Sequence, residues 1–391
     1  MLSKRILKLQ PSPTFALDAK VKQMQLAGIP VINLTLGEPD FSTPKYIQEA
    51  GVRAIREGFT HYTTTAGILD LRKAIVAKLA RENGVDYTPQ EIAVGVGAKQ
   101  LLYHAFQVLC ETGDEVIVPT PTWSTYIEQI ILTGAKPVLA PLKHPFKITA
   151  LNIKKYITSK TKVILLNSPS NPTGSVIEKN ELKKIAQLAI EKDIYVISDE
   201  IYEKIIFEKK HYSIASFGEK MKQLTIVING FSKTYAMTGW RIGYAAGPQE
   251  IIQAMINLQG QTTSNTSSIA QKAAVVALSG DQAPIKKMIN AFKKRRDFLC
   301  HALAQITELS WEKPEGAFYL FVNIKRLLNK KYPTSEKWAE ALLRLASIAV
   351  IPGEAFYAPG YIRICFTTSI KNLSEGVKRI DTFIKNKSQS T

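Results

Sequence analysis

Strand-like and helix-like segments alternate along the central two thirds of the chain. Seven short runs have the length of buried strands, and several are followed by an amphipathic helix such as Glu181–Lys192. Strands that alternate with helices form parallel sheets with helices on both faces. The sequence therefore predicts an α/β fold whose large domain holds a mostly parallel seven-stranded sheet in an α/β/α sandwich. The expected strands are Glu91–Val96, Glu115–Pro119, Pro137–Ala140, Val163–Asn167, Tyr195–Ser198, Thr225–Asn229 and Gly243–Ala246.

The pattern changes after about Ile285. Long helical segments follow, with a strand expected over Gly316–Val322 and a final strand and helix over Tyr361–Cys365 and Leu373–Ile384. A chain of 391 residues is long enough for two domains. We expect a large domain over residues 47–285 and a smaller α+β domain made of residues 1–46 and 286–391.

The net charge of +18 raises the question of nucleic-acid binding. The densest basic cluster, Lys293–Arg296, lies within a helical pattern and is interpreted as a solvated helix face. The other lysines are spread along the chain, so we expect no nucleic-acid partner. No apolar run approaches the roughly 20 residues that span a bilayer, so we expect no membrane partner either.

Cysteine and histidine spacing argues against a disulfide framework or a metal centre. Cys110, Cys300 and Cys365 are far apart in sequence, and the five histidines show no metal-ligand spacing. The basic N-terminus lacks the long apolar core of a secretory signal. We therefore expect no metal and a location in the reducing cytoplasm.

A lysine stands just past the end of one expected strand. Lys233 follows the run Thr225–Asn229, and Arg241 lies eight residues further on in a segment that also holds Ser232. Open α/β sheets bind ligands at the carboxyl ends of their strands. An amine placed there reaches a carbonyl carbon and a guanidinium meets a phosphate, the two groups that pyridoxal phosphate carries. A surface lysine beside a structural arginine explains this segment alone equally well.

A second strand end has the composition of a phosphate-binding turn. Gly97, Ala98 and Lys99 open a helix expected over Leu101–Cys110, and small residues at a helix N-terminus let backbone N–H groups approach a phosphate. The dinucleotide pattern GxGxxG fails because position 100 is Gln. The sequence favours a phosphate cup, with a tight structural turn as the alternative.

Two further strand ends carry polar residues suited to a pyridine ring. Asn171 lies in a loop with two prolines and a glycine, which would hold its amide inward to donate to a ring oxygen. Asp199 ends a strand expected to be buried, so its carboxylate needs a cationic partner such as a protonated pyridine nitrogen. Tyr202 would share the ring oxygen O3′ with Asn171. An Asx turn at Asn171 and a helix N-cap at Asp199 are the competing interpretations.

Trp123 and Arg363 complete the candidate set. Trp123 follows the strand end Pro119 and would stack on the ring, although a tryptophan of this kind is more often part of a core. Arg363 alternates with Ile362 and Ile364, so it points to the opposite face of its strand. Its planar guanidinium suits an α-carboxylate, with a structural ion pair as the alternative.

Taken in order, these motifs resemble the fold-type I pyridoxal-phosphate aminotransferases of class I/II. The resemblance covers nearly the whole chain and is strongest to the bacterial and archaeal aspartate aminotransferase branch. Its anchors are Leu36–Phe41, His61–Tyr62 with Ala66–Gly67, Asn171–Gly174, Ser198–Tyr202, Ser232–Lys233 with Gly239–Arg241, and Arg363.

The resemblance implies roles for the candidate residues. Lys233 is the Schiff-base lysine and proton shuttle, with Asp199 and Tyr202 as the other catalytic residues. The other cofactor-binding residues are Gly97, Ala98, Lys99, Trp123, Asn171, Ser232, Arg241 and, from a neighbouring subunit, Tyr62. The substrate-binding residues are Gly37, Lys99, Trp123, Asn171, Arg363 and Thr14. A homodimer with shared active sites, acting on amino acids and 2-oxo acids, is expected.

Lys99 directs the choice of substrate. It matches the position where the aspartate branch meets the distal carboxylate, so we expect transfer from L-aspartate to 2-oxoglutarate by a ping-pong mechanism. Aromatic amino acids, alanine or prephenate remain alternative substrates on the same scaffold. A carbon–sulfur β-lyase is another alternative, since the same lysine and aspartate support elimination. A non-enzymatic regulator is less favoured, because only about 45 residues precede the first sheet helix.

Overall fold

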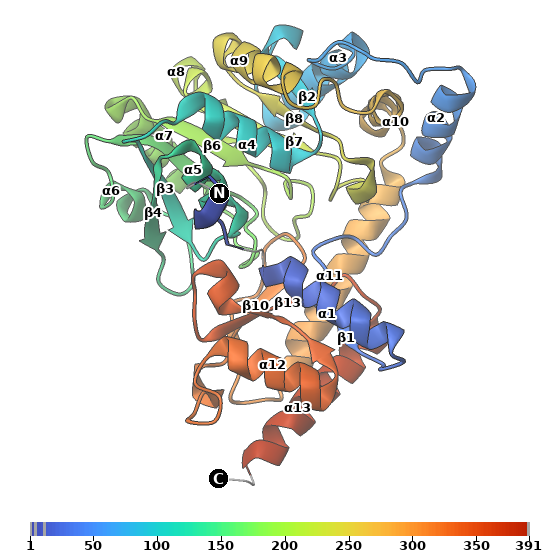
Figure 1. Cartoon of the computed structure of the whole chain (residues 1–391), viewed down its shortest axis with the longest axis vertical. Helices are drawn as coiled ribbons and strands as arrows, with labels where there is room; N and C mark the ends of the chain where they lie inside the picture. Colours follow the sequence, from blue (N-terminus) through green and yellow to red (C-terminus); the bar gives the residue numbers. More distant parts are fainter. Residues whose placement is uncertain (1, 4–5, 11–12, 389–391) are drawn as a thin grey trace.

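The computed structural model describes residues 2–3, 6–10 and 13–388. The side chains of residues 13–16, 18, 387 and 388 lie outside this description. Figure 1 shows an upper part built around a central sheet and a lower part that holds the C-terminal helices and the N-terminal helix.

The central sheet has seven strands in the described part of the chain, in the order β2-β8-β7-β6-β5-β3-β4. Six of these strands run in the same direction, while β8 is antiparallel to both of its neighbours, β2 and β7. All seven strands predicted from the sequence are present. Their bounds are β2 Ile92–Gly95, β3 Glu115–Thr120, β4 Lys136–Pro141, β5 Thr161–Asn167, β6 Tyr195–Asp199, β7 Thr225–Gly230 and β8 Gly243–Ala246.

Helices cover both faces of this sheet, as the buried strands require. Strand β5 illustrates the alternation: Val163 and Leu165 join one core cluster, whereas Ile164 and Leu166 join another on the opposite face. One face packs against α4 Ala98–Leu109, α5 Thr125–Thr133 and α9 Gln249–Gly260. The other packs against α3 Leu69–Lys78, α10 Ser268–Ser279, α6 Ala150–Lys154, α7 Lys179–Lys192 and α8 Glu219–Gln223.

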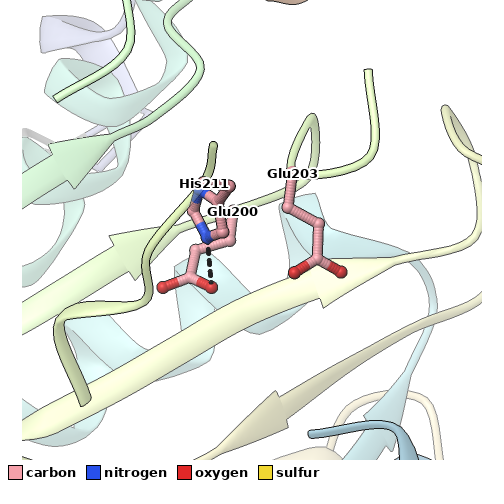
Figure 2. A group of neighbouring side chains, drawn as sticks. All are labelled: Glu200, Glu203 and His211. Atoms are coloured by element: carbon pink, nitrogen blue, oxygen red, sulfur yellow. Dashed lines mark hydrogen bonds and ion pairs between the residues drawn. The ribbon is translucent and has the colours of Figure 1, made fainter. Parts of the chain in front are cut away.

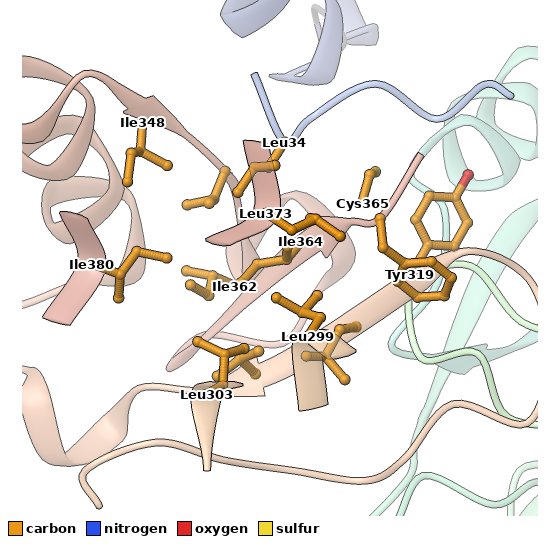
Figure 3. Close-up of a cluster of buried hydrophobic side chains, with 14 of the residues drawn as sticks. Leu34, Leu299, Leu303, Tyr319, Ile348, Ile362, Ile364, Cys365, Leu373 and Ile380 are labelled. Atoms are coloured by element: carbon orange, nitrogen blue, oxygen red, sulfur yellow. The ribbon is translucent and has the colours of Figure 1, made fainter. Parts of the chain in front are cut away.

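The lower part is built on a second, smaller sheet with strand order β12-β13-β10-β9. Its core includes Leu299, Leu320 and Ile364, and Figure 3 shows side chains from widely separated segments meeting there. The strands are β9 Ser310–Trp311, β10 Tyr319–Asn323, β12 Ile351–Pro352 and β13 Tyr361–Cys365. The helices are α1 Pro13–Leu26, α11 Ala283–Leu303, α12 Ser335–Ala346 and α13 Ile370–Ser388.

The N-terminal segment packs with the C-terminal part, as the sequence predicted. Strand β1 Ile32–Asn33 pairs in parallel with β11 Ile348–Ala349, and Leu34 enters the same core as the smaller sheet. The chain then crosses to α2 Lys45–Arg56 in the upper part (Figure 1). Residues 34–44 therefore run between the two parts of the molecule.

Helix α11 joins the two parts. Ile285 near its start packs in a core cluster of the large sheet, whereas Phe292 and Leu303 pack with the smaller sheet. Figure 1 shows this helix running from one part into the other. On this packing we propose the division into a domain of residues 47–285 and one of residues 1–46 and 286–391.

Two details differ from the predictions. The strand expected over 316–322 begins only at Tyr319, because Ala317 has a positive φ of 55° and donates its N–H to the Ile205 carbonyl. The cluster 293–296 is not wholly a solvated face. Arg296 is fully buried, since its guanidinium binds both carboxylate oxygens of Glu208 at 2.6 Å.

Candidate active site

Lys233 lies in the turn that follows β7. Its side chain is half-buried, and its amine donates a 2.6 Å hydrogen bond to the carbonyl of Gly37 in the crossing segment. Burial lowers the pKa of Lys233 to about 8, although the Glu38 carboxylate opposes this shift. About a tenth of the lysine is therefore a neutral amine, the nucleophilic form, at pH 7.

Asp199 ends β6 and is 2% exposed. One carboxylate oxygen accepts from the Tyr126 hydroxyl at 2.7 Å, and the other accepts from the Ile201 N–H at 3.1 Å. No helix follows Asp199, so it caps a turn rather than a helix. Burial raises the pKa of Asp199 to about 6 despite these two donors. Among the described residues no cation forms an ion pair with this carboxylate.

Asn171 and Tyr202 are both buried and approach the site from neighbouring strand ends. The Asn171 N–H donates to the Asn167 side chain at 2.8 Å, which holds the loop after β5 in place. The Asn171 amide oxygen accepts from Arg363 at 2.8 Å, so the amide nitrogen is the end available for donation to a ligand. The Tyr202 hydroxyl lies 2.6 Å from that of Tyr319.

The phosphate turn predicted at residues 97–99 lies directly against Arg241. Helix α4 begins at Ala98, three residues earlier than predicted, with Gly97 at a φ of 80° immediately before it. A Cβ atom on Gly97 would lie only 2.9 Å from an Arg241 guanidinium nitrogen. Glycine is therefore required here, and the result is a cradle of helix N–H groups beside a guanidinium. Ser232 is buried in the adjacent turn.

Lys99 and Trp123 form a cation–π pair at the wall of the site. The Lys99 amine lies 4.7 Å from the centre of a Trp123 ring. Burial, followed by the Arg241 charge, lowers the pKa of Lys99. Trp123 is half-buried, with the edge of its ring against Tyr126.

Arg363 is 3% exposed and points away from the core that holds Ile362 and Ile364, as its strand alternation predicted. Its guanidinium donates to the Thr35 carbonyl and to Asn171, both at 2.8 Å. The Nε atom is buried without a hydrogen-bond partner among the described residues. An arginine with an unused buried donor is suited to receive an anionic group.

One candidate residue is not brought to this site by the single chain, and the side chain of another lies outside the described residues. The Tyr62 side chain is 90% exposed on the surface of the single chain. Thr14 lies on α1, and its side chain is outside the described residues.

Three residues of the site were missed by the sequence reasoning. They are Tyr126, which binds Asp199, Tyr319, which binds Tyr202, and Thr35, which binds Arg363. Tyr126 stands only three residues after Trp123, and its N–H donates to the Trp123 carbonyl, so its nearness to a candidate residue offered a signal. Tyr319 and Thr35 offered none, because each meets its partner only through the packing of distant segments.

Figure 2 shows a second group of ionisable residues, Glu200, Glu203 and His211. Their potential ligand atoms lie close enough together to hold a metal ion. The Glu200 carboxylate already accepts from Ser198 at 2.9 Å, Ser213 at 2.7 Å and His211 at 3.0 Å.

Glu203 pairs with Lys78 at the end of α3 and accepts from Asn83 at 2.9 Å, in the π-helical turn η2 Leu79–Asn83. Burial alone would raise the pKa of Glu203, but Lys78, His211 and Asn83 hold it at about 2. The ammonium group of Lys78 thus already provides the positive charge that a metal would bring. This group is a buried ion network beneath the site.

Comparisons with known proteins agree with this geometry. The sequence model of the family described as aminotransferase class I and II matches residues 29–380. An aspartate aminotransferase of Bacillus sp. strain YM-2 is 46% identical over 98% of this chain and 99% of its own length. A probable aspartate/prephenate aminotransferase of Aquifex aeolicus is 44% identical over 97% of each chain.

Solved structures show the same likeness. The aspartate aminotransferase of Thermus thermophilus with maleate superposes with a TM-score of 0.94 and 39% identity, covering 98% of this chain and 99% of that one. The fold is that of the fold-type I pyridoxal-phosphate enzymes. The chain belongs to the class I and II aminotransferase family, and it is an enzyme that depends on pyridoxal 5′-phosphate.

The residues present fit this cofactor. Asp199 is a buried carboxylate without an ion pair among the described residues, the Gly97 turn sets helix N–H groups beside the Arg241 guanidinium, and Lys233 is a partly neutral amine. A pyridinium nitrogen, a phosphate and an aldehyde are the complements of these three groups.

No helix of the described chain is long and apolar enough to cross a membrane.

Proposed function

We propose that this chain transfers the amino group of L-aspartate to 2-oxoglutarate by a ping-pong mechanism. The observation that carries the proposal is the double anchoring of the crossing segment. Lys233 binds the carbonyl of Gly37, and Arg363 binds that of Thr35, two residues earlier. Two residues of chain span at most about 7 Å, so the amine and the guanidinium both contact one short stretch of the crossing segment.

We propose that Lys233 binds the cofactor aldehyde and that Asp199 faces the ring nitrogen. Asn171 and Tyr202 would hold O3′, and Trp123 would stack on the ring. Ser232, Arg241 and the N–H groups of residues 97–99 would hold the phosphate. When bound, the cofactor supplies an electron sink that lets the substrate α-carbon lose its proton.

Lys233 is suited to move that proton. Its pKa of about 8 lets it accept a proton from the substrate α-carbon and return it near neutral pH. The Gly37 carbonyl, 2.6 Å from the amine, orients the lysine beside the carboxylate receptor Arg363. Closure of the small domain would exclude water from this transfer.

Substrate specificity is proposed to rest on Lys99. Arg363 would receive the α-carboxylate with the help of the Gly37 backbone, and Trp123, Asn171 and Thr14 would line the rest of the substrate pocket. The Lys99 ammonium would then meet the distal carboxylate of aspartate or glutamate. Relatives named aspartate aminotransferase support this choice, and relatives named aspartate/prephenate aminotransferase make prephenate the second substrate to test.

Purified enzyme mixed with L-aspartate alone tests the first half-reaction. We expect the absorbance of the bound cofactor to convert within one turnover and to return on addition of 2-oxoglutarate. Lys233→Ala should abolish repeated turnover. Reaction with phenylalanine or alanine but not with aspartate would contradict the substrate proposal, and release of a thiol with pyruvate from a cysteine conjugate would indicate a β-lyase.

Lys99→Ala tests the specificity proposal. We expect kcat/KM for aspartate to fall about 100-fold while that for alanine changes less than threefold, because one charge-assisted contact contributes about 3 kcal/mol. Lys162→Ala is a matched control, since Lys162 also lies over an aromatic ring, that of Tyr195, but at the opposite, amino-terminal ends of β5 and β6. Equal losses for both amino acids would contradict the role of Lys99.

We also propose a homodimer in which Tyr62 completes the phosphate site of the other subunit. Its 90% exposure in the single chain supports this proposal, because a tyrosine so exposed has its ring free for a partner. Mixing inactive Lys233→Ala subunits with weakly active Tyr62→Phe subunits should restore sites that have both native residues. Absence of restored activity would contradict shared sites.

A cytoplasmic location is proposed from the thiols. All three cysteines are free, with Cys110 and Cys365 buried. Burial raises the pKa of Cys110 to about 12, which keeps it as an unreactive thiol.

A further inference from the structure

Tyr319 occupies a central position that the proposed roles leave unexplained. It begins β10 and is 1% exposed, with its Cα opposite that of Cys365 on β13. Figure 3 shows Tyr319 at the edge of the core of the smaller sheet, with its hydroxyl directed away from the aliphatic side chains. The ring belongs to the core, whereas the hydroxyl enters the site.

Three site residues touch Tyr319. Its hydroxyl lies 2.6 Å from the hydroxyl of Tyr202, and the Arg363 guanidinium carbon lies 4.4 Å from the centre of its ring. A Cβ atom on Gly37 would lie 2.9 Å from the same hydroxyl, so the crossing segment passes directly over it. A single side chain therefore contacts the groups proposed for the cofactor oxygen and for the substrate carboxylate.

Both phenols keep their protons at neutral pH. Burial raises the pKa of Tyr202 and of Tyr319 well above the usual value, although Arg363 opposes the shift in each case. The titratable and charged groups that face Tyr319 are Arg363 and Cys365 from β13, Asp199 from β6, and Tyr202. With one proton each, Tyr319 can donate to Tyr202 while Tyr202 donates onward to a ligand oxygen, and each bond strengthens the other.

We propose that Tyr319 is a positioning residue that supports both halves of the site at once, its hydroxyl acting on Tyr202 and its ring on Arg363. This inference rests on the proposed function. A flat ring beneath a guanidinium fixes the plane in which Arg363 presents its donors to a carboxylate. The hydroxyl makes Tyr202 a stronger donor to O3′.

Tyr319→Phe separates the two actions, because it removes the hydroxyl and keeps the ring. A weaker donation from Tyr202 stabilises the O3′ anion less, so the protonated form of the bound cofactor persists to higher pH. In a pH titration of the holoenzyme absorbance, we expect the midpoint to rise by about half a pH unit. Maleate, a dicarboxylate with no amino group to transfer, should bind within twofold of the wild-type Kd.

Tyr319→Leu removes both the hydroxyl and the ring. We expect the same rise of the absorbance midpoint and, in addition, about a tenfold weaker Kd for maleate, since a buried cation–π contact is lost. An unchanged midpoint in Tyr319→Phe, or an unchanged maleate Kd in Tyr319→Leu, would overturn the corresponding half of the proposal.

Tyr361→Phe is the matched control. Tyr361 lies on β13 of the same small sheet, but its ring stacks on Phe321 in a separate cluster. The Tyr361→Phe variant should leave both the absorbance midpoint and the maleate Kd unchanged. A change in either quantity would show that the loss of any tyrosine hydroxyl in this sheet alters the site, and would overturn the specific role of Tyr319. If the wild-type protein itself has no pH-dependent cofactor absorbance, the proposed function fails, independently of Tyr319.

Discussion

Asp199 and Glu203 lie four residues apart, and both are buried, yet their pKa values move in opposite directions. Burial raises the pKa of Asp199 to about 6. For Glu203 the same effect is overcome by Lys78 and His211, and the pKa falls to about 2. Burial alone therefore does not determine the state of a carboxyl group; the presence of a neighbouring cation does.

The difference separates a site from a structural network. Lys78, which ends α3, supplies the charge that Glu203 needs, so this region is electrostatically complete within the chain. Among the described residues, the hydrogen bonds to the Asp199 carboxylate come from the neutral donors Tyr126 and Ile201, and the Lys233 charge opposes its raised pKa only weakly. A buried carboxylate without a cation is costly, and a cationic ligand would relieve that cost. The comparison thus favours Asp199 as the acid that we propose for the cofactor.

The largest expected effect is the loss of activity on replacing Asp199, the acid without an ion pair among the described residues. Asp199→Ala should lower kcat/KM for transamination at least 1,000-fold, because the ring nitrogen would lose the charge that makes the cofactor an electron sink. Steady-state kinetics with saturating cofactor measure this loss. Glu203→Gln is the control and should change kcat/KM by less than tenfold; a loss as large as that of Asp199→Ala would erase the distinction between the two acids.

Removing the cation that pairs with Glu203 should instead lower the stability of the fold. Lys78→Met leaves Glu203 as a buried charge without its partner, and we expect unfolding to require about 3 to 5 kcal/mol less free energy. Denaturant titration measures the change. The exposed pair of Lys385 and Asp381 is the control, since Lys385→Met should cost less than about 1 kcal/mol. A double replacement of Lys78 and Glu203 by Met should recover much of the loss.

The two acids should also give opposite pH dependences in the cofactor-free protein. Folding raises the pKa of Asp199 from 3.8 to about 6, so its contribution to stability falls as pH rises through this window, by about 3 kcal/mol. Folding lowers the pKa of Glu203 from 4.5 to about 2, so its contribution is present above pH 4.5 and is lost as pH falls toward 2.

Unfolding free energies of the wild type, Asp199→Asn and Glu203→Gln between pH 3 and 8 would test these slopes. The difference between wild type and each variant isolates one acid. Slopes of the same sign for both acids would contradict the comparison.

The smallest effect is expected at Tyr126. Tyr126→Phe removes one hydrogen bond from Asp199, so the pKa of Asp199 should rise further and the acid limb of the kcat/KM profile should move to higher pH. We expect a loss of about fivefold near neutral pH, in line with about 1 kcal/mol for one hydrogen bond. Tyr87→Phe, whose ring lies against the Lys222 amine and forms no contact with Asp199 among the described residues, should leave the profile in place.

Much of the large sheet could be predicted because its signal is local. Each of the seven strands is a short apolar run, and each was expected within three residues of its observed bounds. The β10 strand was less predictable, because the bond from Ala317 to Ile205 connects segments more than 100 residues apart. The burial of Arg296 likewise depends on Glu208, 88 residues away.

The sequence by itself determined the layered α/β class and the types of residue that stand at the strand ends, since these follow from short-range periodicity and from parallel strands sharing one edge. Only the tertiary structure decided their partners. Tyr126 meets Asp199 across 73 residues, Tyr319 meets Tyr202 across 117, and Thr35 meets Arg363 across 328. Such contacts depend on how two separately formed layers pack, and no local pattern encodes that packing.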